Sequence, residues 1–539
     1  MDGKLCLLAL PEEAELLFLA SQTGSLHCAL RNPDDIGSEE PRARATIETL
    51  LTGERVKALK KKRCATLQVI RGGPIAAAIY EGPAATNTEQ YADHGVNGWV
   101  DTAADRLSTF AVDVDTAAYT IARRKLEQGA LPPPEAVRTE EFINYFRYDY
   151  PRPDGNDAPF HVALEAAPSP FDSGRHILRV GLRGIDAGEQ AHKPAHLTFL
   201  VDTSGSMQSA DKIGMVKRSL RFLVDQLEDG DTVALCTYAG EVREVLRPTG
   251  MERRAEIHSA IEELSAGGST AMASGLALAY ALAYRNFQPD AINRVIVCSD
   301  GDANVGATEH GDMLESIAHF ASAGITLSTV GFGMGNYKDH EMEQLADKGN
   351  GNYSYIDTFS QAKRVFGEQL MGTLQVIAKD VKVQVEFNPR TVTRYRLIGY
   401  ENRDIADEDF REDKVDAGEI GAGHMVTALY EIESSNPRGH LATVRVRWKQ
   451  PEGGRADERA FDLEPDHMAQ DFEQASPDFK RAVAAAALAE NLRNSPFKKT
   501  WTLEIAGRVA AAGAGQKADA DDRELLAMIG KVQILTEKR

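Results

Sequence analysis

Five oxygen-bearing side chains in three separate segments are the residues of this sequence most suited to chemistry. The segment LTFLVDTSGSM carries Asp202, Ser204 and Ser206, SAGGSTAM carries Thr270, and RVIVCSDGDAN carries Asp300. The set contains carboxylates and hydroxyls but neither histidine nor cysteine. Hard oxygen ligands of this kind suit Mg²⁺, Mn²⁺ or Ca²⁺ rather than zinc or copper. The residue types therefore predict a divalent-cation site, with Mg²⁺ as the expected ion.

The elements that must position these residues alternate between apolar strands and helices over residues 194–370. LTFLVD, TVALCTYAG, RVIVCSD and ITLSTVGFG are apolar runs, and segments with helical periodicity separate them. Buried parallel strands have this appearance and are joined by helices, so the segment is predicted to form a doubly wound parallel sheet. Asp202 and Asp300 each follow an apolar strand. Because ligands bind beyond the carboxyl ends of such strands, both carboxylates are expected at the functional edge of the sheet.

The pattern Asp202-x-Ser204-x-Ser206, followed along the chain by Thr270 and Asp300, resembles the metal-ion-dependent adhesion site of the von Willebrand factor type A family. The resemblance implies a Rossmann-like domain in which Ser204 and Ser206 bind the metal directly. It also implies that Thr270 binds directly or through water, and that both aspartates bind mostly through water. In that family a carboxylate from a partner completes the coordination shell. A lone DxSxS run is more often a helix-capping turn, but three segments in the family's order favour the metal site.

The length of 539 residues exceeds what one hydrophobic core supports, so several domains are expected. We predict a multidomain α/β protein whose central doubly wound sheet is flanked by α+β and mainly antiparallel β modules. The predicted parts are a small α+β segment (1–80), a linker (81–105), an N-terminal module (106–193), the A domain (194–370) and a β-rich module with a helical tail (375–539).

The last of these parts has two distinct patterns. KDVKVQVEFNP, TVTRYRLIGYE, HMVTALYEI and HLATVRVRWK alternate apolar and polar residues, as half-buried antiparallel strands do. FKRAVAAAALAENLRNS and DDRELLAMIGKVQILTEKR are helical, and the alanine-rich segment Gly507–Ala520 between them is predicted to be loose.

Two further resemblances cover the regions outside the A domain. DVDTAAYTIARRKLEQGALPPPEAVRTEEFINYFRYDYP and the segment beginning KDVKVQVEFNPRTVTRYRLIGYE are similar to modules of a bacterial group called YfbK-like, which accounts for roughly residues 100–539. PEEAELLFLASQTGSLHCALRNPDD, closing with LQVIRGG, resembles the C-terminal part of the Flp (Tad) pilus-assembly proteins. These resemblances suggest a protein of the cell envelope.

Composition excludes several classes of protein. The net charge is -20, which argues against an electrostatic grip on nucleic acid. The five cysteines form no CxxC pair, so neither a zinc site nor a disulfide framework is indicated. No apolar run approaches the roughly 18 residues of a membrane span. Glu12, Glu13 and Glu15 interrupt the apolar start of the chain, so no export signal is expected in it and the compartment is left open.

The motifs of several enzyme classes are absent, and we expect no catalytic activity. HExxH and GxSxG do not occur. DVDTA resembles the start of haloacid-dehalogenase phosphatases, but Ala117 stands at the fifth position and the downstream residues of that family are missing. Asp113 and Asp115 are instead predicted to cap a helix that begins near Thr116.

The leading functional hypothesis is therefore a bacterial metal-ion-dependent protein–protein interaction module, for adhesion or assembly, whose partner presents an acidic residue to the Mg²⁺. The alternative is an accessory subunit of a separate ATPase or chelatase-like system. The chain has no GxxxxGK[ST] loop, so in that case another protein would supply nucleotide hydrolysis. The identity of the partner and the oligomeric state are left open.

Overall fold

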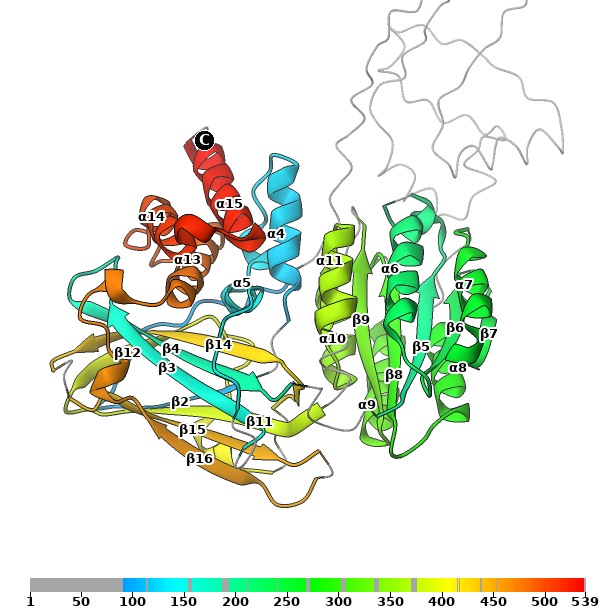
Figure 1. Ribbon diagram of the computed structural model, residues 1–539, viewed down its shortest axis with the longest axis horizontal. Helices are drawn as coiled ribbons and strands as arrows, with labels where there is room; N and C mark the ends of the chain where they lie inside the picture. The colour runs from blue at the N-terminus through cyan, green and yellow to red at the C-terminus, as the bar shows by residue number, and fades with distance from the viewer. Residues whose placement is uncertain are drawn as a thin grey trace, which may run out of the picture. The chain divides into compact units, whose positions relative to one another are not determined.

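The computed structural model describes residues 91–537 apart from thirteen short gaps (Figure 1). The gaps are 113–114, 154–157, 187–192, 210, 240, 268–271, 302–306, 334–338, 370–375, 414, 416, 437–438 and 452. The described residues belong to one compact unit, Pro83–Arg539. The predicted segment at 1–80, residues 81–90 of the predicted linker and Thr270 lie outside them.

A six-stranded sheet forms the centre of the A domain, in the order β10-β9-β8-β5-β6-β7. Its strands are β5 (Ala195–Asp202), β6 (Thr232–Tyr238), β7 (Arg243–Gly250), β8 (Ile292–Ser299), β9 (Ile325–Phe332) and β10 (Tyr353–Ile356). All neighbours are parallel except β6 and β7. Every residue of β5 is buried, which explains its continuous apolar run.

Helices cover both faces of this sheet. One face packs against α6 (Ile213–Gln226), α7 (Arg254–Glu262) and α11 (Phe359–Lys363), which continues into a π-helical turn, η6 (Arg364–Gln369). The other packs against α8 (Met272–Arg285), α9 (Ala307–Ser322) and α10 (Asp339–Lys348). Apolar side chains from each face of the strands enter a separate core. The predicted fold class, with a doubly wound and mostly parallel central sheet, is confirmed.

Two antiparallel sheets form a β-sandwich beside the A domain, with a shared apolar core between them (Figure 1). The first contains β1 (Val100–Asp101), β12 (Val392–Ile398), β14 (Met425–Ser434), β4 (Arg175–Gly184) and β3 (Phe160–Pro168), in that order. The second contains β13 (Ile420–Gly421), β11 (Val376–Phe387), β15 (Ala442–Lys449) and β16 (Asp457–Asp462), while β2 (Leu107–Ala111) pairs with β11. Strands that precede the A domain therefore share both sheets with strands that follow it.

A helical layer covers the first sheet of the sandwich. It consists of α4 (Ala117–Glu127), α5 (Thr139–Asn144), α13 (Pro477–Leu492), α14 (Leu503–Ala514) and α15 (Ala520–Glu537). The α13 helix begins where the sequence signals it, because Pro477 occupies the first turn and the Ser476 side chain accepts a hydrogen bond from Phe479 N. Short 3-10 turns are η2 (Pro134–Ala136), η4 (Gly205–Gln208), η5 (Met251–Arg253), η7 (Asp407–Arg411), η8 (Pro465–His467), η9 (Phe472–Gln474) and η10 (Gly515–Lys517).

The prediction that Gly507–Ala520 is loose is wrong, because α14 occupies much of this segment. Thr502 caps the helix by accepting a hydrogen bond from Ile505 N. Alanine is the strongest helix former, and Val509 and Ala510 are buried in the core shared with α13 and α15. The packing of this small-residue face therefore outweighs the low helix propensity of the glycines at both ends of the segment.

No helix in the described part of the chain combines the length and apolarity that crossing a membrane requires.

Candidate metal centre

The Asp202 turn lies at the carboxyl end of β5, the strand between β8 and β6. The Asp202 side chain is fully buried, and its Oδ1 accepts a hydrogen bond from Ser204 N at 2.8 Å. This bond closes an Asx turn, which directs the chain into the 3-10 turn that carries Ser206. The Oγ atoms of Ser204 and Ser206 lie 2.9 Å apart. The structure therefore brings these three predicted ligands together.

The second carboxylate reaches the same edge because β8 is parallel to β5 and pairs with it, so that Val201 stands opposite Cys298. Asp300 follows β8 directly and is buried. Ser299 Oγ donates to Asp202 Oδ2 at 3.0 Å, and Tyr238 from β6 donates to the same oxygen at 3.2 Å. Four of the five predicted ligands, including Asp300, thus belong to one cluster.

Burial sets the electrostatics of this cluster. It raises the pKa of the Asp202 carboxyl, and the nearby Asp300 raises that pKa further, while hydrogen bonds from Ser204 and Ser299 oppose the rise. Two carboxylates with little access to water repel each other, so a cation between them is favoured. The donor set of carboxylate and hydroxyl oxygens fits a hard divalent cation such as Mg²⁺.

Thr270, the fifth predicted ligand, falls in the gap 268–271, so its position stays a prediction. The chain just before it is held near the site, because Gly267 N donates to Thr203 O at 2.7 Å.

Lys212 is a member of the site that the sequence analysis did not identify. Its Nζ lies 2.9 Å from Asp300 Oδ2, and both side chains are largely buried. The lysine stem packs against Gly333, where a Cβ would lie only 2.2 Å from Lys212 Cγ. In the sequence, the one indication that Lys212 belongs to the site is its position shortly after the DTSGSM turn. A divalent cation that binds near Asp300 must share this carboxylate with the ammonium or displace it.

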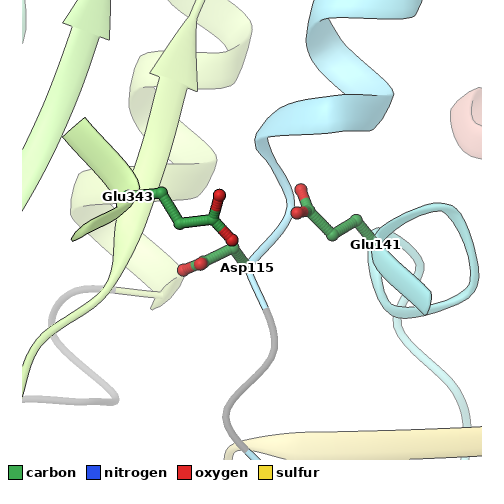
Figure 2. Close-up of side chains that lie close together, drawn as sticks. All are labelled: Asp115, Glu141 and Glu343. Atoms are coloured by element: carbon green, nitrogen blue, oxygen red, sulfur yellow. The ribbon is translucent and has the colours of Figure 1, made fainter. Parts of the chain in front are cut away.

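A second group of carboxylates consists of Asp115, Glu141 and Glu343 (Figure 2). Asp115 precedes α4, Glu141 belongs to α5, and Glu343 belongs to α10 of the A domain. All three are buried, with carboxylate oxygens within 4.8 Å of one another. Asp115, which the sequence predicts as a helix cap, accepts a hydrogen bond from Tyr353 N at 2.8 Å.

Two arginines compensate these carboxylates. Arg138 pairs with Glu141 and lies 3.6 Å from Glu343, while Arg403 lies 3.2 Å from Asp115 and 3.7 Å from Glu343. Because guanidinium groups already satisfy the acids, the group is an ion-pair network that joins the A domain to α4 and α5. No sequence signal could indicate this network, since its members are single charged residues far apart in the chain.

This network predicts a pH-dependent stability. Burial raises the pKa of Glu141 to about 7; Arg138 opposes the rise and Glu343 adds to it. Between about pH 4.5 and 7 the Glu141 carboxyl is therefore protonated in the folded protein but ionised in the unfolded chain. The contribution of protonated Glu141 to the unfolding free energy is complete below this range and is lost as the pH rises through about 7. The shift corresponds to about 3 kcal/mol. We expect Glu141→Gln to flatten the fall in unfolding free energy between about pH 5 and 8.

Urea unfolding at several pH values measures this slope. The matched control is Glu135→Gln, which changes an exposed glutamate on the neighbouring 3-10 turn. Equal slopes for the wild type and Glu141→Gln would contradict the prediction.

Comparison with known proteins matches three parts of the chain to families. The family described as "von Willebrand factor type A domain" matches residues 196–368, and "Uncharacterized protein YfbK, C-terminal" matches 372–440 and 433–535. A family described as "von Willebrand factor" matches residues 85–179. Since these matches begin at residue 85, the resemblance of residues 1–80 to pilus-assembly proteins stays a prediction.

The comparisons also found individual proteins that are similar to this chain. The chain is 37% identical to "Uncharacterized protein YfbK" of Escherichia coli over 473 residues, which is 83% of this chain and 81% of the relative. It is 25% identical to "Uncharacterized protein sll0103" of Synechocystis, covering 40% of this chain and 50% of that protein. A solved structure, "von Willebrand factor type A from Catenulispora acidiphila", has a TM-score of 0.42 and 19% identity over 71% of this chain and 99% of that one. These descriptions name no catalytic activity.

Proposed function

This chain belongs to the YfbK family of proteins with a von Willebrand factor type A domain, and from that premise we propose that it is a metal-ion-dependent protein–protein interaction module. In the proposed mechanism, Asp202, Ser204, Ser206, Thr270 and Asp300 hold one Mg²⁺, and the Mg²⁺ binds a carboxylate of a partner protein. Type A domains are typical of adhesion and interaction modules. The resemblance of residues 1–80 to pilus-assembly proteins supports a partner in the cell envelope.

One observation supports the proposal: the Asp202 turn and Asp300 come at the carboxyl ends of two paired parallel strands, and the two carboxylates are near enough to interact electrostatically. Mg²⁺ keeps part of its coordination shell for water or outside ligands. When bound, the ion would supply positive charge that attracts an anionic group. The protein's part is to hold the serine hydroxyls and the buried carboxylates around it. With only two carboxylates in the set, the bound ion would keep net attraction for a carboxylate from outside.

The direct test is a pair of calorimetric titrations on the full chain. Mg²⁺ is titrated first, and acetate is then titrated into the loaded protein as a carboxylate probe. We expect one Mg²⁺ site and an acetate heat that disappears with a chelator. Absence of Mg²⁺ binding, or an acetate heat that persists after chelation, would contradict the proposal.

Lys212 provides a second prediction about this site. Its ammonium competes with the cation for Asp300, and a hydrogen bond between two charged groups contributes about 1.5–3 kcal/mol. Lys212→Met keeps the apolar stem beside Gly333 and removes the charge, so we expect the affinity for Mg²⁺ to rise by about tenfold or more. Calorimetry measures this change.

The control is Lys217→Met on α6, the helix that Lys212 precedes. The Lys217 ammonium donates to Glu262 O at 2.6 Å and lies at the surface. This variant should leave the affinity for Mg²⁺ unchanged. A Lys212→Met variant that binds Mg²⁺ no better than the wild type would show that the ion pair does not oppose the metal.

A further inference from the structure

Gly333 lies at the carboxyl edge of the A-domain sheet, the edge that carries the candidate metal centre. It directly follows β9, which is parallel to β8 and pairs with it so that Gly331 stands opposite Ser299. Gly333 has a φ of +78°, in the left-handed region that favours glycine. A Cβ at this position would lie 2.4 Å from Lys212 Cε and 2.7 Å from Lys212 Cδ. The apolar stem of Lys212 therefore packs directly on the Gly333 backbone.

Two buried side chains, Arg124 and Tyr355, bind the Gly333 carbonyl oxygen. Arg124 Nη1 donates a hydrogen bond to it at 2.9 Å, and the Tyr355 hydroxyl donates to the same oxygen. Arg124 also donates to the Tyr355 hydroxyl, and its guanidinium carbon lies 4.9 Å from the centre of the Tyr355 ring. Hydrogen bonds from a charged donor are stronger than neutral ones, and burial strengthens them further. The Gly333 carbonyl is therefore held in one position.

Arg124 reaches this carbonyl from outside the A domain. It belongs to α4, whose residues Ala118 and Ala122 lie in the core of the helical layer. Ala117 and Ile121 of the same helix lie in the core on one face of the A-domain sheet. The α4 helix is thus packed on both sides, and Arg124 extends from it to the sheet edge that carries the metal centre.

Lys212 connects Gly333 with the metal centre, because its ammonium lies 2.9 Å from Asp300 Oδ2. From these contacts we propose that Arg124 is a positioning residue of this centre. By fixing the Gly333 carbonyl, Arg124 holds the Lys212 stem in place and keeps the ammonium at Asp300. The proposal rests on the proposed function and adds its regulation: α4 restrains cation binding, because the ammonium competes with the cation for Asp300. By linkage, a partner that moves α4 away from Gly333 raises the affinity for Mg²⁺.

Amine labelling of the metal-free full chain tests the positioning role independently of the cation. The chain is treated with N-acetoxysuccinimide, and mass spectrometry of its peptides measures the rate of acetylation at Lys212. Arg124→Met keeps an unbranched apolar side chain on α4 and removes the hydrogen bonds of the guanidinium, so we expect this rate to rise about three- to tenfold. Lys217, at the surface of α6, is the internal reference and should react at an unchanged rate.

Arg123→Met is the matched control, because Arg123 precedes Arg124 on α4 and is also buried. Its guanidinium pairs with Asp357 of the A domain at 2.6 Å. This variant weakens the contact between α4 and the A domain without removing a hydrogen bond to the Gly333 carbonyl, so acetylation of Lys212 should be unchanged. Unchanged acetylation of Lys212 in Arg124→Met, or an equal rise in Arg123→Met, would overturn the proposal.

Tyr355→Phe decides the question in the same way if Arg124→Met fails to fold. This variant keeps the ring beside the guanidinium and removes the hydroxyl that bonds both Arg124 and the Gly333 carbonyl. Acetylation of Lys212 should therefore rise in Tyr355→Phe as well, and acetylation at the wild-type rate would overturn the proposal.

Calorimetry with Mg²⁺ connects this positioning role to the metal centre. Arg124→Met should raise the affinity for Mg²⁺, but by a smaller factor than Lys212→Met does. In the Lys212→Met background, Arg124→Met should have no further effect, because the two residues act along one path. An equal rise in both backgrounds would overturn the proposal. If the wild type bound no Mg²⁺, the proposed function would fail, while acetylation would still decide whether Arg124 positions Lys212.

Discussion

Replacing Asp202 by asparagine is expected to abolish stabilisation of the A domain by Mg²⁺ while the metal-free protein stays folded. A ligand at about 100 times its dissociation constant adds about 2.7 kcal/mol to the stability of the protein that binds it. Asparagine retains the volume of Asp202 and an oxygen that can accept the hydrogen bond from Ser204 N. It removes the charge that burial beside Asp300 disfavours. The amide nitrogen replaces the oxygen that accepts hydrogen bonds from Ser299 and Tyr238, so these two effects on stability oppose each other, and the metal-free variant should stay folded.

Thermal unfolding with and without Mg²⁺, together with calorimetry, measures this effect. The wild type should gain stability as Mg²⁺ is added, and Asp202→Asn should not. Asp229→Asn is the matched control, since it changes an exposed aspartate in the turn between α6 and β6. If Asp202→Asn gained as much stability from Mg²⁺ as the wild type, Asp202 would play no part in binding the ion.

Replacing Arg396 by methionine is expected to lower the unfolding free energy of the β-sandwich and its helical layer by about 3–5 kcal/mol. Arg396, Glu431 and Glu490 are fully buried between the sandwich and the helical layer. The guanidinium lies 3.1 Å from Glu431 and 3.2 Å from Glu490. Burial opposes ionisation of Glu490, but Arg493 and Arg396 hold the pKa of this carboxyl below its usual value. Loss of Arg396 leaves buried carboxylates with less compensation, and this causes the destabilisation.

The same strand offers a matched control. Arg394 forms an ion pair with Glu433 at the surface, and its side chain is 41% exposed. Exposed pairs contribute about 0–1 kcal/mol, so Arg394→Met should have a small effect. Urea unfolding followed by tryptophan fluorescence is selective for this module, because Trp99, Trp448 and Trp501 are the three tryptophans and all lie outside the A domain. Equal losses in both variants would contradict the prediction.

The positions of four metal-site residues could be predicted because they follow from apolar strands that are visible in the local sequence. The strands that lead to Asp202 and Asp300 are apolar because they are buried on both faces. Their continuous apolar runs can therefore be recognised in the sequence. Parallel strands end at one edge, so residues that follow them meet there. The clustering of Asp202, Ser204, Ser206 and Asp300 agrees with this reasoning.

Elements with weak periodicity were harder to predict. The β7 strand, REVLRPTG, is an antiparallel edge strand with only two buried residues, and its charged residues give no apolar run. The α14 helix was interpreted as loose because alanine and glycine dominate it. In both cases a neighbour supplies the stabilising contacts: β6 pairs with β7, and α13 and α15 pack on α14. The local sequence pattern of a segment does not indicate which element will pack against it.

The A domain, the spacing of its oxygen ligands and most of the strands after it could be predicted from the amino-acid sequence alone, because burial of one or both faces imposes a period on neighbouring residues. Three other features became visible only in three dimensions. Strands on either side of the A domain share two sheets, as β4 does with β14. Lys212 contacts Asp300, and Arg403 contacts Asp115 across 288 residues of sequence. Such contacts depend on the path of the whole chain, and a single charged residue leaves no periodic signal of its distant partner.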